Sequence, residues 1–152
     1  IAIFNRSHYE DIIAVRVKKI FPDPVWKRRY KHVLDFESML AEEGTVIIKL
    51  FLNISKEEQK KRLESRLQDP DKLWKFCMDD LDDRNRWDEF QTAYQDLIEK
   101  TSTPEAPWYI IPADRKWYRN LVVARLMVEK LRHLQLSLPT PNFDPASIII
   151  PD

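Results

Sequence analysis

Three stretches of apolar residues predict β-strands. Residues 45–53 are β-branched or apolar almost throughout, which is typical of a strand in a parallel sheet covered on both faces. Residues 1–4 form a short apolar run that breaks into a polar stretch, and this pattern predicts a buried strand followed by a functional loop. Residues 108–111 are the third candidate, which stops at Pro112.

Apolar residues at helical spacing predict four helices between and after these strands. The first ends near Gly44, a typical helix stop. Ser55 and Glu58 form a capping box that opens the second, and Asp69 and Pro70 end it. We expect each apolar stripe to pack into the core. In chain order the stripes are Trp26, Tyr30, Val33, Phe36 and Leu40; Leu63 and Leu67; Trp87, Phe90, Tyr94, Leu97 and Ile98; and Trp117, Leu121, Ala124, Val128 and Leu131.

The alternation of strands with long helices predicts the fold class. Strands separated by helices favour right-handed crossovers and an α/β fold, with a parallel sheet covered by helices on both faces. Residues 137–152 contain four of the ten prolines and predict an extended C-terminal tail.

Composition narrows the range of partners. The 152 residues are enough for one domain, and lysine plus arginine equals aspartate plus glutamate at 25 each. No net charge therefore draws the protein to nucleic acid or to a membrane surface, so an anion site must be a local cluster. The apolar runs are too short to span a bilayer, and the single Cys77 fits a reducing compartment. We expect a cytoplasmic protein.

Charged residues follow each predicted strand. Ligands of open parallel sheets bind beyond the carboxyl ends of the strands, so these clusters are candidate sites. Residues 5–11 follow the first strand, the arginines of the Ser55 helix follow the second, and a third cluster follows residue 111. Loops are polar in any case, and this remains the alternative explanation for each cluster.

The second cluster suits phosphate chemistry. Arg62 and Arg66 stand one helical turn apart, and Lys72 and Lys75 follow the break at residues 69–70. Phosphoryl transfer needs cations that close over the phosphate oxygens and exclude water. The alternative is a solvated helix face on which these cations pair with neighbouring glutamates, namely Glu57, Glu58 and Glu64.

Four motifs are distinctive in combination. They are residues 4–11 (FNRSHYED), residues 62–67 with 69–70 and 72–76, residues 101–103 with 106–108, and residues 112–121 (PADRKWYRNL). Together they resemble the polyphosphate kinase 2 family, and the similarity covers roughly residues 1 to 136.

The resemblance implies a fold and an activity. The fold would be the three-layer α/β/α arrangement of P-loop kinases, with residues 1–136 as a partial domain, a lid at about 55–90 and the tail at 137–152. The activity would be magnesium-dependent phosphoryl transfer between inorganic polyphosphate and AMP, ADP or ATP, in a homodimer or homotetramer.

The resemblance also implies roles for individual residues. The catalytic residues would be Arg6, Glu10, Asp11 and Arg66. Phosphate or nucleotide would be bound by Asn5, Tyr9, Arg62, Lys72, Lys75, Asp114, Arg115, Lys116 and Arg119. Asp11 could hold magnesium through water, and no residue is assigned as a direct metal ligand. Many family members have aspartate at position 5; Asn5 cannot supply that carboxylate and resembles the branch that accepts nucleoside monophosphates as well as diphosphates.

One departure from the family pattern is large. The glycine-rich phosphate loop of the G-x-x-x-x-G-K type is absent from these 152 residues, and Gly44 cannot replace it. We therefore expect this stretch alone to be inactive, most simply because its numbering begins partway along a longer chain. Two other classes stay open: a non-catalytic interaction protein with a kinase fold, and a single-stranded nucleic-acid-binding module, which net neutrality disfavours.

Overall fold

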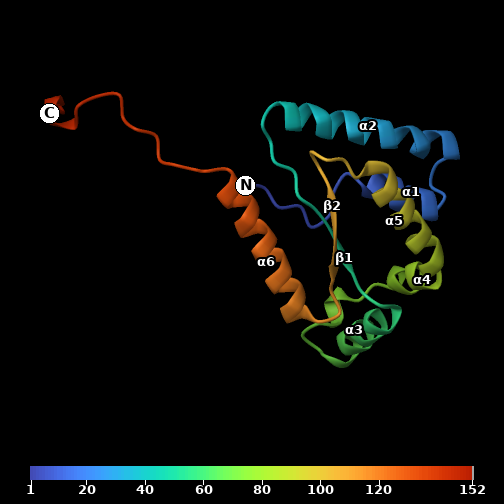
Figure 1. The fold of residues 1–152 in the computed structure, drawn as a ribbon. Helices are drawn as coiled ribbons and strands as arrows, with labels where there is room; N and C mark the ends of the chain where they lie inside the picture. The colour runs from blue at the N-terminus through green and yellow to red at the C-terminus, as the bar shows by residue number, and fades with distance from the viewer. Residues whose placement is uncertain (152) are drawn as a thin grey trace.

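The computed structural model describes residues 1–151 and shows an α/β fold built around a small parallel sheet (Figure 1). Strands β1 (Lys49–Asn53) and β2 (Trp108–Pro112) pair in parallel, in register from Lys49 opposite Trp108 to Asn53 opposite Pro112. The crossover between them contains α3 (Lys56–Gln68), the 3-10 turn η1 (Leu73–Lys75), α4 (Asp79–Asn85) and α5 (Trp87–Thr101). The helices α1 (Glu10–Val17) and α2 (Asp23–Glu42) precede the sheet, and α6 (Lys116–His133) and the turn η2 (Pro145–Ser147) follow it.

The core lies where α1, α2 and α5 pack together. Its buried side chains include Ile12 and Val15 from α1, Trp26 and Val33 from α2, and Leu97 from α5. Burial of apolar surface of this kind is the main stabilising contribution to a domain of this size. The core therefore fixes α1 relative to α2 and α5.

Helix α1 differs from the prediction of a functional loop over residues 5–11. Glu10 and Asp11 form its first turn, where acidic side chains favour the helix dipole. The sequence pattern hides the helix because α1 is buried nearly all round, so its apolar residues show no amphipathic spacing.

Four of the other helices lie at the predicted positions, but Phe36 and Leu67, which we expected in the core, are 46% and 52% exposed. The α2, α3, α5 and α6 helices cover the four predicted stripes, and Ser55 caps α3 by accepting a hydrogen bond from the Glu58 backbone N–H at 3.1 Å. Only half of the predicted capping box forms, because the Ser55 N–H donates to Asp114 Oδ1 at 2.7 Å.

The predicted strand at residues 1–4 is not formed. Ile1, Ile3 and Phe4 are 99%, 81% and 77% exposed, and no strand among residues 1–151 pairs with this segment. An extended segment becomes a strand only when a neighbour satisfies its backbone groups. The second strand is also shorter than predicted, because it begins at Lys49 and not at Thr45.

The predicted burial of the α6 stripe is wrong. Trp117, Leu121 and Val128 are 63%, 41% and 46% exposed. Helix α6 packs along β2, away from α1, α2 and α5, so that only one of its edges is covered within the described residues (Figure 1). The strands are likewise open in part, since Leu52 and Ile110 are exposed.

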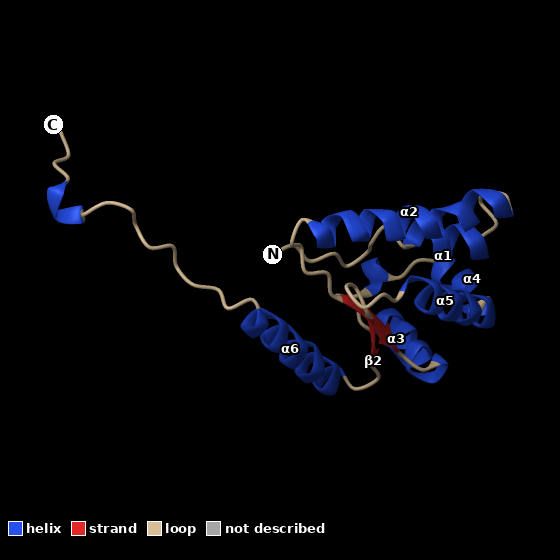
Figure 2. Cartoon of the chain, turned by 45° about the horizontal axis from the view of Figure 1, so that its top comes forward, coloured by secondary structure: helices blue, strands red, loops and turns tan. Residues whose placement is uncertain are grey.

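After α6 the chain extends away from the helices (Figure 2). Among residues 1–151, no helix has both the length and the apolar character needed to cross a membrane.

Candidate functional site

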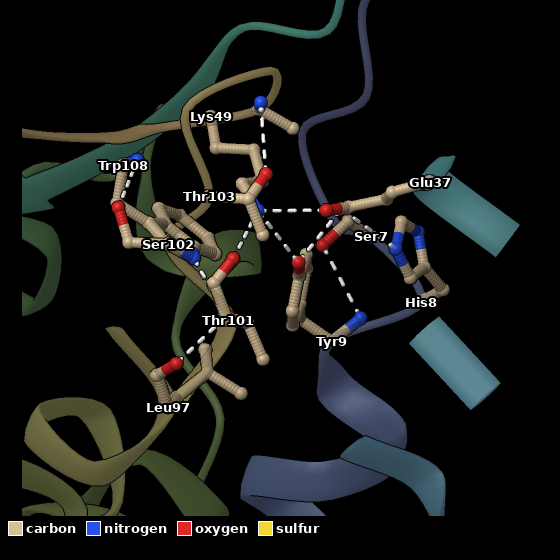
Figure 3. A network of polar contacts seen from close by, with 11 residues as sticks. Ser7, His8, Tyr9, Glu37, Lys49, Leu97, Thr101, Ser102, Thr103 and Trp108 are labelled. Atoms are coloured by element: carbon tan, nitrogen blue, oxygen red, sulfur yellow. Dashed lines mark hydrogen bonds and ion pairs between the residues drawn. The ribbon is translucent and has the colours of Figure 1, made fainter. Parts of the chain in front are cut away.

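The segment at residues 5–11 is anchored by one buried side chain. Tyr9 is 4% exposed, and its hydroxyl donates to Glu37 Oε1 at 2.7 Å while accepting from Lys49 Nζ at 3.0 Å (Figure 3). Glu37 belongs to α2 and Lys49 opens β1. The start of α1 is thus tied to both a helix and the sheet.

A polar network continues below Tyr9. Lys49 Nζ forms an ion pair with Glu37 Oε2 at 2.7 Å and donates to the Thr101 carbonyl at 2.6 Å. The Thr101 hydroxyl donates to the Leu97 carbonyl at 2.7 Å and accepts from Trp108 Nε1 at 2.9 Å. The buried polar groups of Lys49, Glu37 and Thr101 are therefore all paired, as low-polarity surroundings require.

Burial dominates the proton affinities in this network. It lowers the pKa of Lys49, and the ion pair with Glu37 opposes that effect. It also raises the pKa of Tyr9, with the hydrogen bond to Glu37 acting in the same direction. Tyr9 is consequently a neutral donor over the whole physiological range.

Arg6 and Glu10 lie on either side of Tyr9 along the chain and remain accessible to solvent. They form an ion pair at 3.4 Å, and their side chains are 83% and 50% exposed. The pKa of Tyr94 is raised by burial first and then by the charges of Glu10 and Asp83, whereas Arg6 opposes the shift.

The cations of the predicted lid are engaged within that segment. Arg66 Nη1 lies 3.4 Å from Asp80 Oδ2, Lys72 is paired with Asp69, and Lys75 Nζ lies 5.1 Å from the centre of the Trp74 ring. No ion pair within residues 1–151 joins these cations to Glu10 or Asp11. Within the described residues, Arg66, Lys72 and Lys75 therefore have their partners inside the predicted lid.

The second and third predicted clusters do meet at the carboxyl ends of the strands. Arg62 Nη2 donates to the Ala113 and Asp114 carbonyls at 2.8 and 3.2 Å, and Arg62 Nε donates to Glu58 Oε1 at 2.8 Å. With the bond from the Ser55 N–H to Asp114, these contacts tie α3 to the loop after β2. A hollow beside them is lined by residues that include Asn53, Ile54, Pro112, Arg115 and Tyr118.

The first cluster does not follow the strand-end rule. Residues 1–4 form no strand, and Tyr9 packs its ring 4.9 Å from that of Trp108, the first residue of β2. Asn5 and Asp11, which lie on either side of Tyr9 in the sequence, are exposed to solvent. At the other end of the sheet, Lys116 opens α6, and the guanidinium of Arg119 donates to Asn120 Oδ1.

Sequence reasoning missed Glu37 and Lys49. One available signal was a charged residue inside an apolar strand, because Lys49 interrupts the run at residues 45–53. A second was Glu37, a charged residue four positions after Val33 and three before Leu40, which is a core position of the α2 stripe.

The described residues contain no group of three or more histidine, cysteine, aspartate or glutamate side chains placed to hold a metal ion. A divalent ion held by protein carboxylates alone does not fit this donor set. Asp11, the residue predicted to hold magnesium through water, is exposed in the first turn of α1.

The fold defines a class: an α/β domain built on a small parallel sheet, with charged clusters at both ends of its strands. A family model described as polyphosphate kinase 2 (PPK2) matches residues 1–138. The chain belongs to the polyphosphate kinase 2 family.

Relatives and solved structures agree with this assignment. The chain is 53% identical to an AMP/ADP-polyphosphate phosphotransferase of Meiothermus ruber over 99% of its own length and 56% of the relative. It is 37% identical to an ADP-polyphosphate phosphotransferase of Rhodopseudomonas palustris, with 91% and 52% covered. The crystal structure of polyphosphate kinase 2 from Arthrobacter aurescens matches with a TM-score of 0.89 at 48% identity, over 95% of this chain and 51% of that one. The chain thus spans about half the length of the relatives it matches.

Proposed function

We propose that this chain is part of a phosphotransferase that moves phosphoryl groups between inorganic polyphosphate and AMP, ADP or ATP. The observation that carries the proposal is an accessible Arg6–Glu10 pair on a buried anchor, within a chain that belongs to the polyphosphate kinase 2 family. The names of the similar phosphotransferases support the substrates.

In this proposal the whole protein has the three-layer fold of P-loop kinases, with a lid at about residues 55–90. This sequence contains a single glycine, so the glycine-rich loop whose backbone N–H groups bind nucleotide phosphates lies elsewhere in the protein. The assembly is a homodimer or homotetramer and works in the cytoplasm. The proline-rich residues 137–152 form its tail.

The residues at the start of α1 bind the nucleotide that accepts the phosphoryl group. Arg6 binds phosphate, Glu10 and Asp11 orient the acceptor, and Asn5 completes the nucleotide contact, while the buried Tyr9 holds this segment from behind. Because Asn5 is neutral, this surface repels a nucleotide phosphate less than a carboxylate would, which suits AMP as well as ADP.

The lid supplies charge to the transferred group. Arg66, Lys72 and Lys75 close over the phosphates, where their charge stabilises the transition state. Their present partners can be exchanged: the Arg66–Asp80 pair has side chains 38% exposed, and an exposed pair of this kind contributes only about 0–1 kcal/mol. A polyanion can therefore replace Asp80 at small cost.

The carboxyl ends of the strands take the remaining contacts. Arg62 ties the base of the lid to the loop after β2, and in doing so it presents Asp114 and Arg115 to the hollow between them. We propose that this loop, with Lys116 and Arg119 from the first turn of α6, binds phosphate or nucleotide.

Magnesium fits as an ion carried largely by the substrates. Asp11 is the residue of this chain placed to hold it, through water. When bound, the ion would neutralise charge on the phosphate oxygens.

The test is a phosphotransfer assay on the full-length protein that contains this sequence, with polyphosphate, magnesium and AMP or ADP. We expect ADP from AMP, and ATP from ADP, only when polyphosphate is present. Absence of both products, together with binding of single-stranded nucleic acid that weakens steeply with salt, would contradict the proposal.

A further inference from the structure

A contribution to folding stability does not explain the buried ion pair between Glu37 and Lys49. The two side chains are only 4% and 5% exposed, and their separation is 2.7 Å. A buried ion pair contributes little net stability compared with apolar residues of the same volume, because both charges lose their hydration. Neither residue belongs to the motifs that resemble the family, so the pair calls for another explanation.

We infer that Glu37 and Lys49 are positioning residues that hold Tyr9, and through it the carboxylates of Glu10 and Asp11, in the orientation that meets the nucleotide. The inference rests on the proposed function, because it assigns a role to residues behind that site. It makes no claim that Glu37 or Lys49 touches a substrate.

The first argument is the geometry around the Tyr9 hydroxyl. It donates to Glu37 and accepts from Lys49, so both its hydrogen and one lone pair are fixed by charged partners (Figure 3). Lys49 is itself fixed by the Thr101 carbonyl at the end of α5, and the Trp108 ring packs against the Tyr9 ring. Four elements, α2, β1, α5 and β2, therefore determine the position of one phenol.

The second argument is the path from Tyr9 to the carboxylates. Tyr9 is the residue that precedes α1, and its carbonyl accepts from the N–H groups of Ile12 and Ile13 at 3.0 and 3.1 Å. Glu10 and Asp11 lie between these residues in the first turn. A displaced Tyr9 would therefore displace Glu10 and Asp11 with it.

A purely structural role is the competing explanation, and the chemistry of the pair allows the two to be separated. Removing one partner leaves a buried charge, which destabilises the fold by itself. Replacing both, as in Glu37→Gln with Lys49→Met, removes both charges at nearly constant volume and should leave the fold intact. Tyr9→Phe removes only the hydroxyl.

The experiment compares this double variant and Tyr9→Phe with Asp35→Asn in the full-length protein. Asp35 is a matched control, because it lies on the same helix in an exposed ion pair with Lys31. Hydrogen exchange of the backbone amides of residues 9–13 is measured without substrate. Then kcat and KM are measured with polyphosphate and AMP or ADP, and the folded fraction is measured for each variant.

We expect both test variants to remain folded, to exchange these amides at least about threefold faster than the control, and to lose about tenfold in kcat. The KM for the nucleotide should change less than kcat, because the phosphate contacts are retained. The inference is overturned if either test variant matches Asp35→Asn in exchange or in kcat, or if the loss of kcat equals the loss of folded protein.

The two proposals fail separately. If the wild-type protein transfers no phosphoryl group, the proposed function fails, and the exchange rates alone decide whether Glu37 and Lys49 hold the start of α1. If the wild type is active and the exchange rates are unchanged, only the positioning role fails.

Discussion

Arg62 offers the sharpest separation between an anchoring and a phosphate-binding role. Its guanidinium donates to two backbone carbonyls of the loop after β2 and to Glu58, and its side chain is 24% exposed. A hydrogen bond from a charged donor contributes about 1.5–3 kcal/mol, and the pair with Glu58 adds about 0.3–0.5 kcal/mol. Because the site is partly solvated and the second carbonyl contact is longer, we expect Arg62→Ala to lower the free energy of unfolding by about 2–3 kcal/mol.

The assay is thermal or denaturant unfolding of Arg62→Ala and of Arg62→Lys. For a chain of this size, the expected loss lowers the melting temperature by about 5–10 °C. Lysine keeps the charge but lacks the planar fork, so it should recover only a part of the loss. Unchanged stability of Arg62→Ala, with weaker binding of polyphosphate, would refute this reasoning and return Arg62 to a role in phosphate contact.

Two further predictions concern the core and its titration. Leu97 is 1% exposed among α1, α2 and α5, so Leu97→Ala should lower the free energy of unfolding by about 2–5 kcal/mol, as measured by urea unfolding. A loss below about 1 kcal/mol would contradict the packing described here. Because the pKa of Tyr94 is higher in the folded protein than its ordinary value of 10.0, the neutral phenol stabilises the fold fully below pH 10.0. That stabilisation is lost as the pH rises above 10.0. In Tyr94→Phe, the free energy of unfolding should therefore fall less steeply with pH above about pH 10, by up to about 1.4 kcal/mol per pH unit. Equal slopes of the free energy of unfolding against pH in both proteins would contradict this prediction.

The sequence predicts most helices here because their signals are local. Ser55 caps α3 as its position before a charged helix indicates, and the stripe of Trp87 to Leu97 packs one face of α5 into the core. Helix α1 escapes prediction because its four buried residues, Ile12, Ile13, Val15 and Val17, do not fall on one face and so give no amphipathic pattern.

Burial and pairing depend on the rest of the fold, and there the sequence misleads. Residues 1–4 are apolar enough for a strand but lack a partner strand among the described residues. The α6 stripe is apolar enough for a core, yet Trp117 remains exposed.

The residues of the candidate site differ in the same way: some have local sequence signals, and others are placed only by the fold. Helical spacing singles out Arg66, and the resemblance to the family singles out Arg6 and Glu10; the roles of all three remain predictions. The anchor behind them joins Tyr9, Glu37 and Lys49, and the last two are 28 and 40 positions from Tyr9 along the chain. Only the folded structure brings these side chains together.

The central claim is that the cationic segment after β1 closes over a chain of phosphates. Its most direct test is the rate of polyphosphate-dependent phosphorylation of AMP and ADP by Arg66→Ala, in the full-length protein, with Arg125→Ala on α6 as a control of equal charge change. We expect Arg66→Ala to lower kcat by about 10²-fold or more, since it removes charge that acts on the transferred phosphoryl group, and Arg125→Ala to match the wild type. Wild-type kcat and KM in Arg66→Ala would contradict the claim.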